Sequence, residues 1–256
     1  MNTANELLSP GAVAGLRALY PPPSWVRGAT AEYDAEFLLG LVTAQAPTRI
    51  VEIGVAAGVS SAVLLYALDT LPEPSSRSLY SCDVQPECYF DARRATGEIV
   101  GTMYPQPVAA WTLNTNVDTR RLAGVLSPAS IDLTFIDANH AHPWPLLDLL
   151  HMTVLAKPGS WVALHDINLP AIAPAHAPWG AKLLFDEWPF EKVVGGGSRR
   201  NIGAVKLPHD FTLLRPLAHS LLDRAWEHSP TLWHVRLPDW FAEVQVQVER
   251  RIAQAA

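Results

Sequence analysis

Five short apolar runs alternate with helical patterns along the chain, and this alternation limits the possible folds more than any other feature of the sequence. Each run is bounded by turn residues, and the runs span Arg49–Gly54, Ser78–Asp83, Val108–Leu113, Ile131–Asp137 and Ser160–Asp166. Helices are predicted at Glu32–Ala46, Ser60–Leu71, Glu87–Val100, Trp144–Ala156 and Gly180–Glu187. Strands that alternate with helices are typical of a parallel sheet covered on both faces. The sequence therefore predicts a doubly wound α/β fold.

The pattern changes after the fifth run. Phe190–Val194 and Ile202–Leu207 flank a glycine-rich loop, which predicts an antiparallel hairpin. We therefore expect a Rossmann-like sheet of seven strands, mostly parallel, with a terminal antiparallel hairpin. The predicted organisation is an N-terminal helical lead-in over residues 1–31, a main domain over 32–207 and a C-terminal helical extension over 208–256.

Composition excludes several classes of protein. The 256 residues are 49% hydrophobic and 17% charged with a net charge of −6, which is typical of a compact globular chain and not of a disordered one. Basic residues cluster only in pairs, so a nucleic-acid partner is not expected. The sequence contains neither a signal-peptide pattern nor an apolar run of roughly 18 residues, so we expect a cytoplasmic protein with no membrane partner. Cys82 and Cys88 fit neither a zinc site nor a disulfide framework.

The first predicted strand runs into a loop of small residues that opens directly into a helix. The loop has the form ExGxxxG, with Glu52, Gly54 and Gly58 at its fixed positions. It lacks both the GxGxxG pattern of dinucleotide sites and the Gly-Lys-Ser/Thr of a P-loop. The second strand ends at Asp83, where a carboxylate can accept the hydroxyls of a ribose bound at the first loop. A nucleoside-containing ligand is therefore expected at this edge of the sheet.

The chain resembles the class I S-adenosylmethionine-dependent methyltransferases in four features. These are the ExGxxxG loop, Asp83, the strand end Phe135-Ile136-Asp137 and the terminal hairpin. The run from Ile131 to His140, followed by Gly159 to Asp166, is similar to the bacterial group that methylates oxygens of sugars and natural products. The resemblance covers about Glu32 to Leu207. It implies that residues 32–207 form a methyltransferase domain and that S-adenosylmethionine is the cofactor. The implied cofactor-binding residues are Glu52, Gly54, Val55, Ala57, Gly58, Ser60, Asp83 and Asp137.

Methyl transfer to a hydroxyl requires removal of a proton from the acceptor. Polar side chains follow the fourth and fifth predicted strands, whose ends should be neighbours, and the catalytic candidates are His140, His165 and Asp137. Relatives of this family hold a divalent ion at the same place, and Asp137 and Asp166 match two of its ligands. Ile167 stands where those relatives have an acid or an amide. The resemblance therefore leaves two alternatives open. Either the site holds a divalent cation, which is Mg²⁺ or another, or a histidine acts as the base without a metal.

The predicted function is O-methylation of a small hydroxylated molecule, such as a sugar or an intermediate of secondary metabolism. The alternatives are a nucleoside-cofactor enzyme of another class, which would transfer an aminopropyl group or use NAD, and a non-catalytic module that binds S-adenosylmethionine. The apolar C-terminal extension also makes a homodimer an expectation.

Overall fold

The computed structural model describes residues 8–174, 177–196, 201–231 and 235–255. Their contacts divide them into two compact units. The first comprises the described residues up to Asp118 together with Gly195 and Gly196, and the second comprises those of Thr119–Val194 and Asn201–Ala256. Each unit is described separately below.

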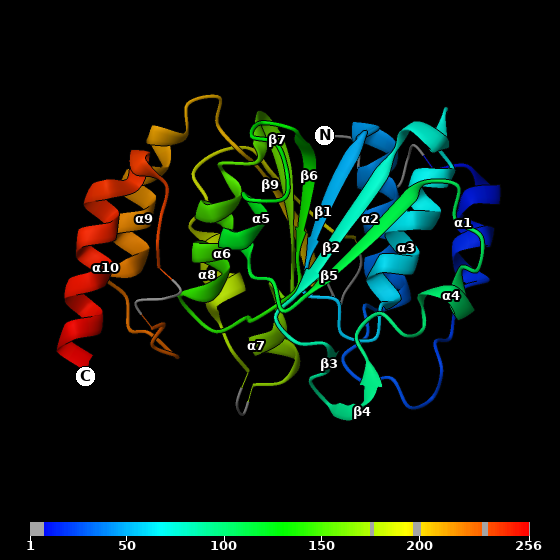
Figure 1. Cartoon of the computed structure of the whole chain (residues 1–256), viewed down its shortest axis with the longest axis horizontal. Helices are drawn as coiled ribbons and strands as arrows, with labels where there is room; N and C mark the ends of the chain where they lie inside the picture. The colour runs from blue at the N-terminus through cyan, green and yellow to red at the C-terminus, as the bar shows by residue number, and fades with distance from the viewer. Residues whose placement is uncertain (1–7, 175–176, 197–200, 232–234, 256) are drawn as a thin grey trace. The chain divides into compact units, whose positions relative to one another are not determined.

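The strands form a seven-stranded sheet in the order β5-β2-β1-β6-β7-β9-β8 (Figure 1). β9 is antiparallel to both β7 and β8, whereas the pairs β1/β2, β2/β5 and β6/β7 are parallel. The predicted fold class is therefore confirmed. The sheet strands are β1 (Arg49–Ile53), β2 (Ser78–Asp83), β5 (Ala110–Thr115), β6 (Ile131–Ile136), β7 (Ala156–His165), β8 (Lys192–Val194) and β9 (Ile202–Lys206).

In the first unit, two helices pack against each other beside β1, β2 and β5. α2 (Glu32–Gln45) and α3 (Val59–Asp69) lie side by side, and α3 is apolar around most of its circumference, as a helix enclosed by other elements must be (Figure 1). Register pairs Ile53 with Cys82 and Cys82 with Asn114, so the three strands end at one edge. The unit also contains α1 (Pro10–Arg17), η2 (Pro74–Ser76) and α4 (Val100–Met103).

The helix predicted over Glu87–Val100 is wrong. β3 (Glu87–Cys88) pairs antiparallel with β4 (Asp91–Ala95) in a separate two-stranded sheet. The Asp91 carboxylate accepts hydrogen bonds from the backbone and side chain of Arg93, a local bond that competes with helix formation. Cys88 and Ile99 are buried against Ala57 and Val59, so burial of this segment does not require a helical face.

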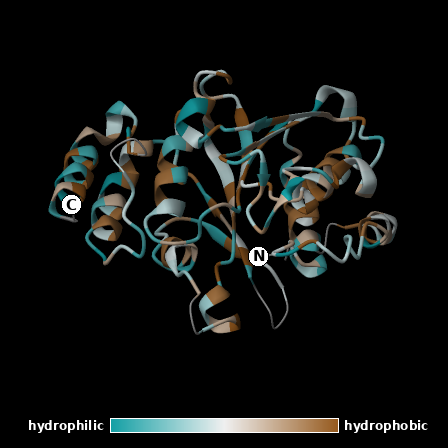
Figure 2. Ribbon diagram, turned by 60° about the horizontal axis from the view of Figure 1, so that its bottom comes forward, coloured by the Kyte–Doolittle hydropathy of each residue, from teal (hydrophilic) through white to brown (hydrophobic). Residues whose placement is uncertain are grey.

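In the second unit, α6 (Trp144–Met152) packs against β6, and α8 (Gly180–Asp186) packs against β7 and β9. α9 (Arg215–Leu222) and α10 (Ala242–Ala255) lie side by side, and α10 carries both hydrophobic and hydrophilic residues (Figure 2). Val244 and Val248, four positions apart, form its buried side. The other helical elements are α5 (Thr119–Leu122), α7 (Leu169–Ile172), η3 (Phe211–Leu214) and η5 (Asp239–Phe241).

Some boundaries differ from those predicted. The third strand begins two residues later than expected, at Ala110, and α6 ends at Met152, because Ala156 already pairs with Ile131 as the start of β7. Within the described part of the chain, no helix has the length and apolar character needed to cross a membrane.

Candidate active site

The loop after β1 contains three residues whose backbone has a positive φ. Gly54, Ala56 and Gly58 have φ values of +87°, +46° and +99°. A Cβ on Gly58 would lie 2.6 Å from Cγ2 of Val100 and 3.0 Å from Cα of Gly97. The loop is therefore fixed in a left-handed conformation and leaves no room for a side chain at Gly58.

Asp83, at the end of β2, holds this loop directly. Its Oδ2 accepts hydrogen bonds from the backbone N–H groups of Val55 (3.0 Å) and Ala56 (3.2 Å), and its Oδ1 accepts one from Gln85 (3.0 Å). The side chain is partly exposed. Since a carboxylate has about four lone-pair sites, capacity remains for a ligand hydroxyl. The structure thus brings Asp83 together with Val55 in the predicted loop, which also contains Gly54, Ala57 and Gly58.

Glu52 has a different position from the other predicted cofactor contacts. Its side chain is 0% exposed, and its two carboxylate oxygens accept hydrogen bonds from the hydroxyls of Ser60 (2.6 Å), Ser61 (2.6 Å) and Ser81 (2.5 Å). These bonds tie the end of β1 to the first turn of α3 and to β2. Glu52 and Ser60 therefore support the loop from within the protein. Sequence reasoning missed Ser81 because its partner lies on a neighbouring strand.

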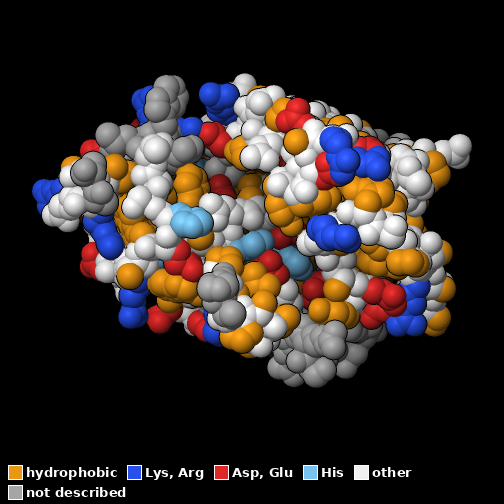
Figure 3. All heavy atoms as spheres, turned by 90° about the horizontal axis from the view of Figure 1, so that it is seen from below, with side chains coloured by type: hydrophobic (Ala, Val, Ile, Leu, Met, Phe, Trp, Pro, Cys, Tyr) orange, Lys and Arg blue, Asp and Glu red, His pale blue; other side chains and the backbone are white. Residues whose placement is uncertain are grey.

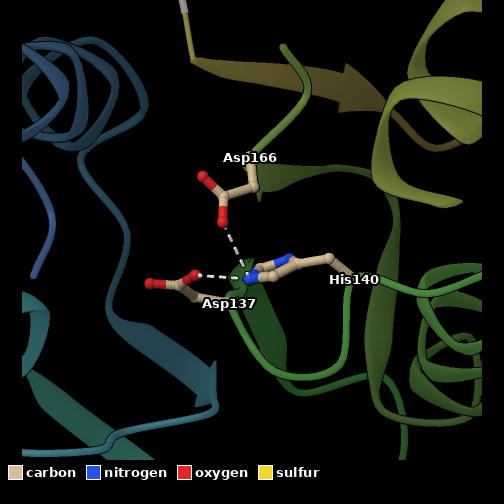
Figure 4. A group of neighbouring side chains, drawn as sticks. All are labelled: Asp137, His140 and Asp166. Atoms are coloured by element: carbon tan, nitrogen blue, oxygen red, sulfur yellow. Dashed lines mark ion pairs between the residues drawn. The ribbon is translucent and has the colours of Figure 1, made fainter. Parts of the chain in front are cut away.

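In the second unit, two histidines and two aspartates meet at the ends of β6 and β7. His140 Nε2 lies 3.0 Å from Asp166 Oδ2 and 3.5 Å from Asp137 Oδ1, so its ring stands between the two carboxylates (Figure 4). His165 Nδ1 lies 3.0 Å from Asp137 Oδ1 and 3.5 Å from Asp166 Oδ1. The four side chains that the sequence singled out here form one cluster, and each imidazole is in reach of both carboxylates.

The four side chains of this cluster differ in their exposure to solvent. The side chain of His140 is 19% exposed, that of Asp137 14% and that of Asp166 16%, whereas His165 is only 7% exposed. Figure 3 shows histidine side chains that reach the surface beside acidic ones on the face seen there. His140 is therefore the more accessible imidazole, and His165 is placed to orient Asp137.

Asn201 is a member of this site that sequence reasoning missed. It immediately precedes β9, its side-chain amide donates to Asp166 Oδ1, and its side-chain oxygen accepts from the backbone N–H of Asn168 (3.1 Å). Its carbonyl accepts a further bond from Ile167. Asp166 has a φ of +59°, which is unfavourable for a residue other than glycine. Asn201 thus stabilises the backbone conformation of Asp166, which lies 35 positions earlier in the sequence. No local sequence pattern predicts a contact between residues so far apart.

The donor atoms of this cluster suit a divalent cation. Asp137, His140 and Asp166 each offer one ligand atom, and these atoms all lie within 4.8 Å of one another. Carboxylate oxygens fit Mg²⁺, and a mixed carboxylate and imidazole set also fits transition metals. Ile167 is buried with 5% exposure and supplies no ligand atom. The predicted pair Asp137 and Asp166 thus gains His140 as its third neighbour, from the loop that follows β6.

Comparison with known proteins identifies the domain that contains these residues. Residues 51–167 match a family model described as a methyltransferase domain. These residues form a methyltransferase domain. The matched segment includes the loop after β1, Asp83 and the whole His/Asp cluster, whereas Asn201 follows it in the sequence. No curated protein matches the chain.

Several solved structures resemble this chain. The SAH-bound methyltransferase PaMTH1 from Podospora anserina has 12% identity and a TM-score of 0.52, with 79% of this chain and 89% of that chain covered. Cofactor-bound Rv0187 from MTB has 18% identity, a TM-score of 0.51 and coverages of 78% and 88%. The O-methyltransferase TomG from Streptomyces achromogenes, in complex with SAM, has 17% identity, a TM-score of 0.49 and coverages of 80% and 92%. The first two structures confirm the predicted fold, and the match of residues 51–167 confirms a methyltransferase domain.

Proposed function

We propose that this methyltransferase transfers the methyl group of S-adenosylmethionine to a hydroxyl of a small molecule. The observation that carries the proposal is the cluster of His140, His165, Asp137 and Asp166 within the methyltransferase domain, because methyl transfer to a hydroxyl needs a group that takes its proton. A similar fold in a SAH-bound methyltransferase supports S-adenosylmethionine as the donor. A sugar or an intermediate of secondary metabolism remains the expected acceptor class.

The residues of the first unit fit the donor. Gly54 and Ala56 are partly exposed, so a ligand can approach the backbone of the loop there. Asp83 can accept a ribose hydroxyl with the lone pair that its three hydrogen bonds leave unused. When bound, S-adenosylmethionine supplies an electrophilic methyl group on a sulfonium. Glu52 and Ser60 keep the loop in shape through buried hydrogen bonds. Asp137, the last of the predicted cofactor contacts, belongs to the second unit, where it faces His165.

We assign the proton transfer to His140. Its side chain is 19% exposed, and its Nε2 lies 3.0 and 3.5 Å from the carboxylates of Asp166 and Asp137. Since carboxylates accept hydrogen bonds, Nε2 carries a hydrogen here, and Nδ1 is the ring nitrogen that takes the proton of the acceptor hydroxyl. His165 holds Asp137 in place through its Nδ1. The division of roles follows from access, since His165 is more deeply buried than His140.

A metal-assisted route uses the same atoms. An ion held by Asp137, Asp166 and His140 would lower the pKa of an acceptor hydroxyl, and His140 would then be a ligand and no longer a base. The two routes are mutually exclusive at the Nε2 atom. They make opposite predictions for chelation, because only the metal route loses activity when divalent ions are removed.

The test has two stages. Calorimetric titration with S-adenosylhomocysteine probes the donor site without knowledge of the acceptor, and micromolar binding supports the proposal. A panel of hydroxylated acceptors is then assayed with and without EDTA, for the wild type, His140→Ala and the surface variant Glu191→Ala. Absence of S-adenosylhomocysteine binding contradicts the proposed donor, and full turnover by His140→Ala contradicts the assigned base.

A further inference from the structure

The C-terminal extension reaches back to the loop that carries His140. Glu227 lies after α9, 85 positions after His142. Its Oε2 accepts a hydrogen bond from the backbone N–H of His142 (2.6 Å), and the backbone N–H groups of Glu227 and His228 donate to the carbonyl of His142 (2.9 and 3.3 Å). The side chain of Glu227 therefore binds the N–H of His142, and the backbone of the extension binds its carbonyl.

The same carboxylate holds a second segment. The backbone N–H of Trp179 lies 3.1 Å from each oxygen of Glu227. The ring of Trp179 stacks on that of His142, with centroids 5.2 Å apart and an interplanar angle of 24°. His142 Nε2 in turn bonds the carbonyl of Leu221 in α9 (2.9 Å). One side chain thus joins the loop after β6, the segment before α8 and the C-terminal extension.

The loop has little room to move toward α8. The N–H of Gly180 donates to the carbonyl of His140 (2.9 Å). A Cβ on Gly180 would lie 2.5 Å from the backbone nitrogen of His142 and 2.7 Å from that oxygen, so the two backbones are in direct contact. Because Trp179 precedes Gly180 directly, a carboxylate that holds Trp179 and His142 together also maintains this contact.

We propose that Glu227 is a positioning residue for the imidazole of His140, and that the C-terminal extension is therefore part of the catalytic apparatus. The role of His140 rests on the proposed function, but its position does not. Loss of the Glu227 carboxylate leaves the N–H groups of His142 and Trp179 without this acceptor, and the loop relaxes at the residue two positions after His140. His140 then leaves its place between Asp137 and Asp166.

The experiment compares three variants of the full chain with the wild type. Glu227→Ala removes both acceptor oxygens. Glu227→Gln retains one oxygen, which can accept both N–H groups as Oε2 does. Glu187→Ala is the matched control, because Glu187 is a half-exposed carboxylate of the same unit that pairs with Arg224 at 3.6 Å and does not contact the loop through the bonds above.

The first readout is independent of turnover. In protein labelled with ¹³C at histidine Cε1, the His140 resonance is assigned by its loss in His140→Gln. We expect this resonance to shift and broaden in Glu227→Ala, and to keep its wild-type position in Glu227→Gln and Glu187→Ala. An unchanged His140 resonance in a folded Glu227→Ala overturns the proposal. If Glu227→Ala does not fold, Glu227→Asp takes its place, since the shorter side chain cannot reach both N–H groups.

The second readout is kinetic. We expect Glu227→Ala to lower kcat about 10- to 100-fold, because a small displacement of a reacting group has an effect of this size. Affinity for S-adenosylhomocysteine should stay within about twofold, and Glu227→Gln should restore most of kcat. Equal losses in Glu227→Gln and Glu227→Ala contradict positioning through the hydrogen bonds. A wild type without methyl transfer to any acceptor contradicts the proposed function alone, because the resonance of His140 still tests its position.

Discussion

Gly58→Ala places a methyl group where the structure has no space. Gly58 caps α3 with φ +99° and ψ +22°, and an alanine in the left-handed region costs roughly 1–2 kcal/mol. The new Cβ also meets Cγ2 of Val100 at 2.6 Å and Cα of Gly97 at 3.0 Å. The Val100 methyl can rotate away, but the backbone of Gly97 cannot, so we add about 1–3 kcal/mol for overpacking.

The unfolded chain offsets part of this loss. Alanine has less conformational freedom than glycine when unfolded, which favours the folded state by about 0.4–1 kcal/mol. The expected decrease in the free energy of unfolding is therefore about 1–5 kcal/mol. The shift of the loop also moves the N–H groups of Val55 and Ala56 relative to Asp83, so the affinity for S-adenosylhomocysteine should fall as well.

Urea unfolding measures the first effect, and calorimetry measures the second. Gly101→Ala and Gly11→Ala are the matched controls, since a Cβ at either helical position meets nothing within 4 Å. Removal of a helical glycine should raise stability by about 0.5–1 kcal/mol. The free energy of unfolding should therefore decrease in Gly58→Ala and increase in the two control variants. A Gly58→Ala protein that is as stable as Gly101→Ala, with unchanged affinity, would falsify this account of the loop.

Three further predictions concern single side chains. Asp83→Asn keeps an oxygen for the N–H groups of Val55 and Ala56 but loses the acceptor of the Gln85 N–H, whereas Asp83→Ala loses all three bonds. We expect both variants to weaken S-adenosylhomocysteine binding by about 1.5–3 kcal/mol and the alanine variant to lose more stability than the asparagine variant, as titration and urea unfolding will show. Burial lowers the pKa of His142 from about 6.5 to about 4, so the unfolded state binds more protons and stability should fall by up to about 3 kcal/mol as pH decreases from 6.5 to 4. The slope of unfolding free energy against pH should flatten in His142→Gln, and an equal slope would contradict the assignment. EDTA should leave turnover unchanged if His140 is the base and abolish it if His140 is a metal ligand.

Hydrophobic patterning predicted the central strands of the sheet because they are buried, so that runs of apolar residues mark them. β6 and β7 are buried along most of their lengths, and the positions of their ends in the sequence are enough to place Asp137 and Asp166 at one edge of the sheet. The same reasoning failed at Glu87–Val100, where short strands cover the loop after β1 and local bonds of Asp91 replace helical ones. Apolar residues in that segment indicated burial, but not the geometry in which they are buried.

Contacts made through backbone groups were beyond prediction. Glu227 accepts bonds from two N–H groups, and any residue at His142 or Trp179 except proline would supply them. The identities of the side chains therefore do not predict that Glu227 binds these two N–H groups. Glu52 shows the opposite difficulty, since its position in the ExGxxxG loop suggested a cofactor contact, whereas its carboxylate bonds buried hydroxyls that lie on α3 and β2.

The antiparallel strand explains how a residue at the start of β9 can serve a site built from strand ends. His165, the last residue of β7, pairs with Ile202, so Asn201 stands beside Asp166 at the same edge. Asn201→Asp would replace the amide that donates to Asp166 with a second carboxylate. Two carboxylates at this distance repel each other unless they share a proton or a cation.

We therefore expect Asn201→Asp to be less stable than the wild type in EDTA, by about 1–3 kcal/mol for the lost bond to a charged group. If the cluster binds divalent ions, Mn²⁺ should raise the Tm of Asn201→Asp more than that of the wild type, because the added carboxylate strengthens the site. Asn201→Ala loses the same bond without adding charge, so it should lose stability and show no greater response to Mn²⁺ than the wild type. Equal stability of Asn201→Asp and the wild type in EDTA would contradict the bond between Asn201 and Asp166. A response to Mn²⁺ that is the same in all three proteins would instead place any bound ion away from Asp166.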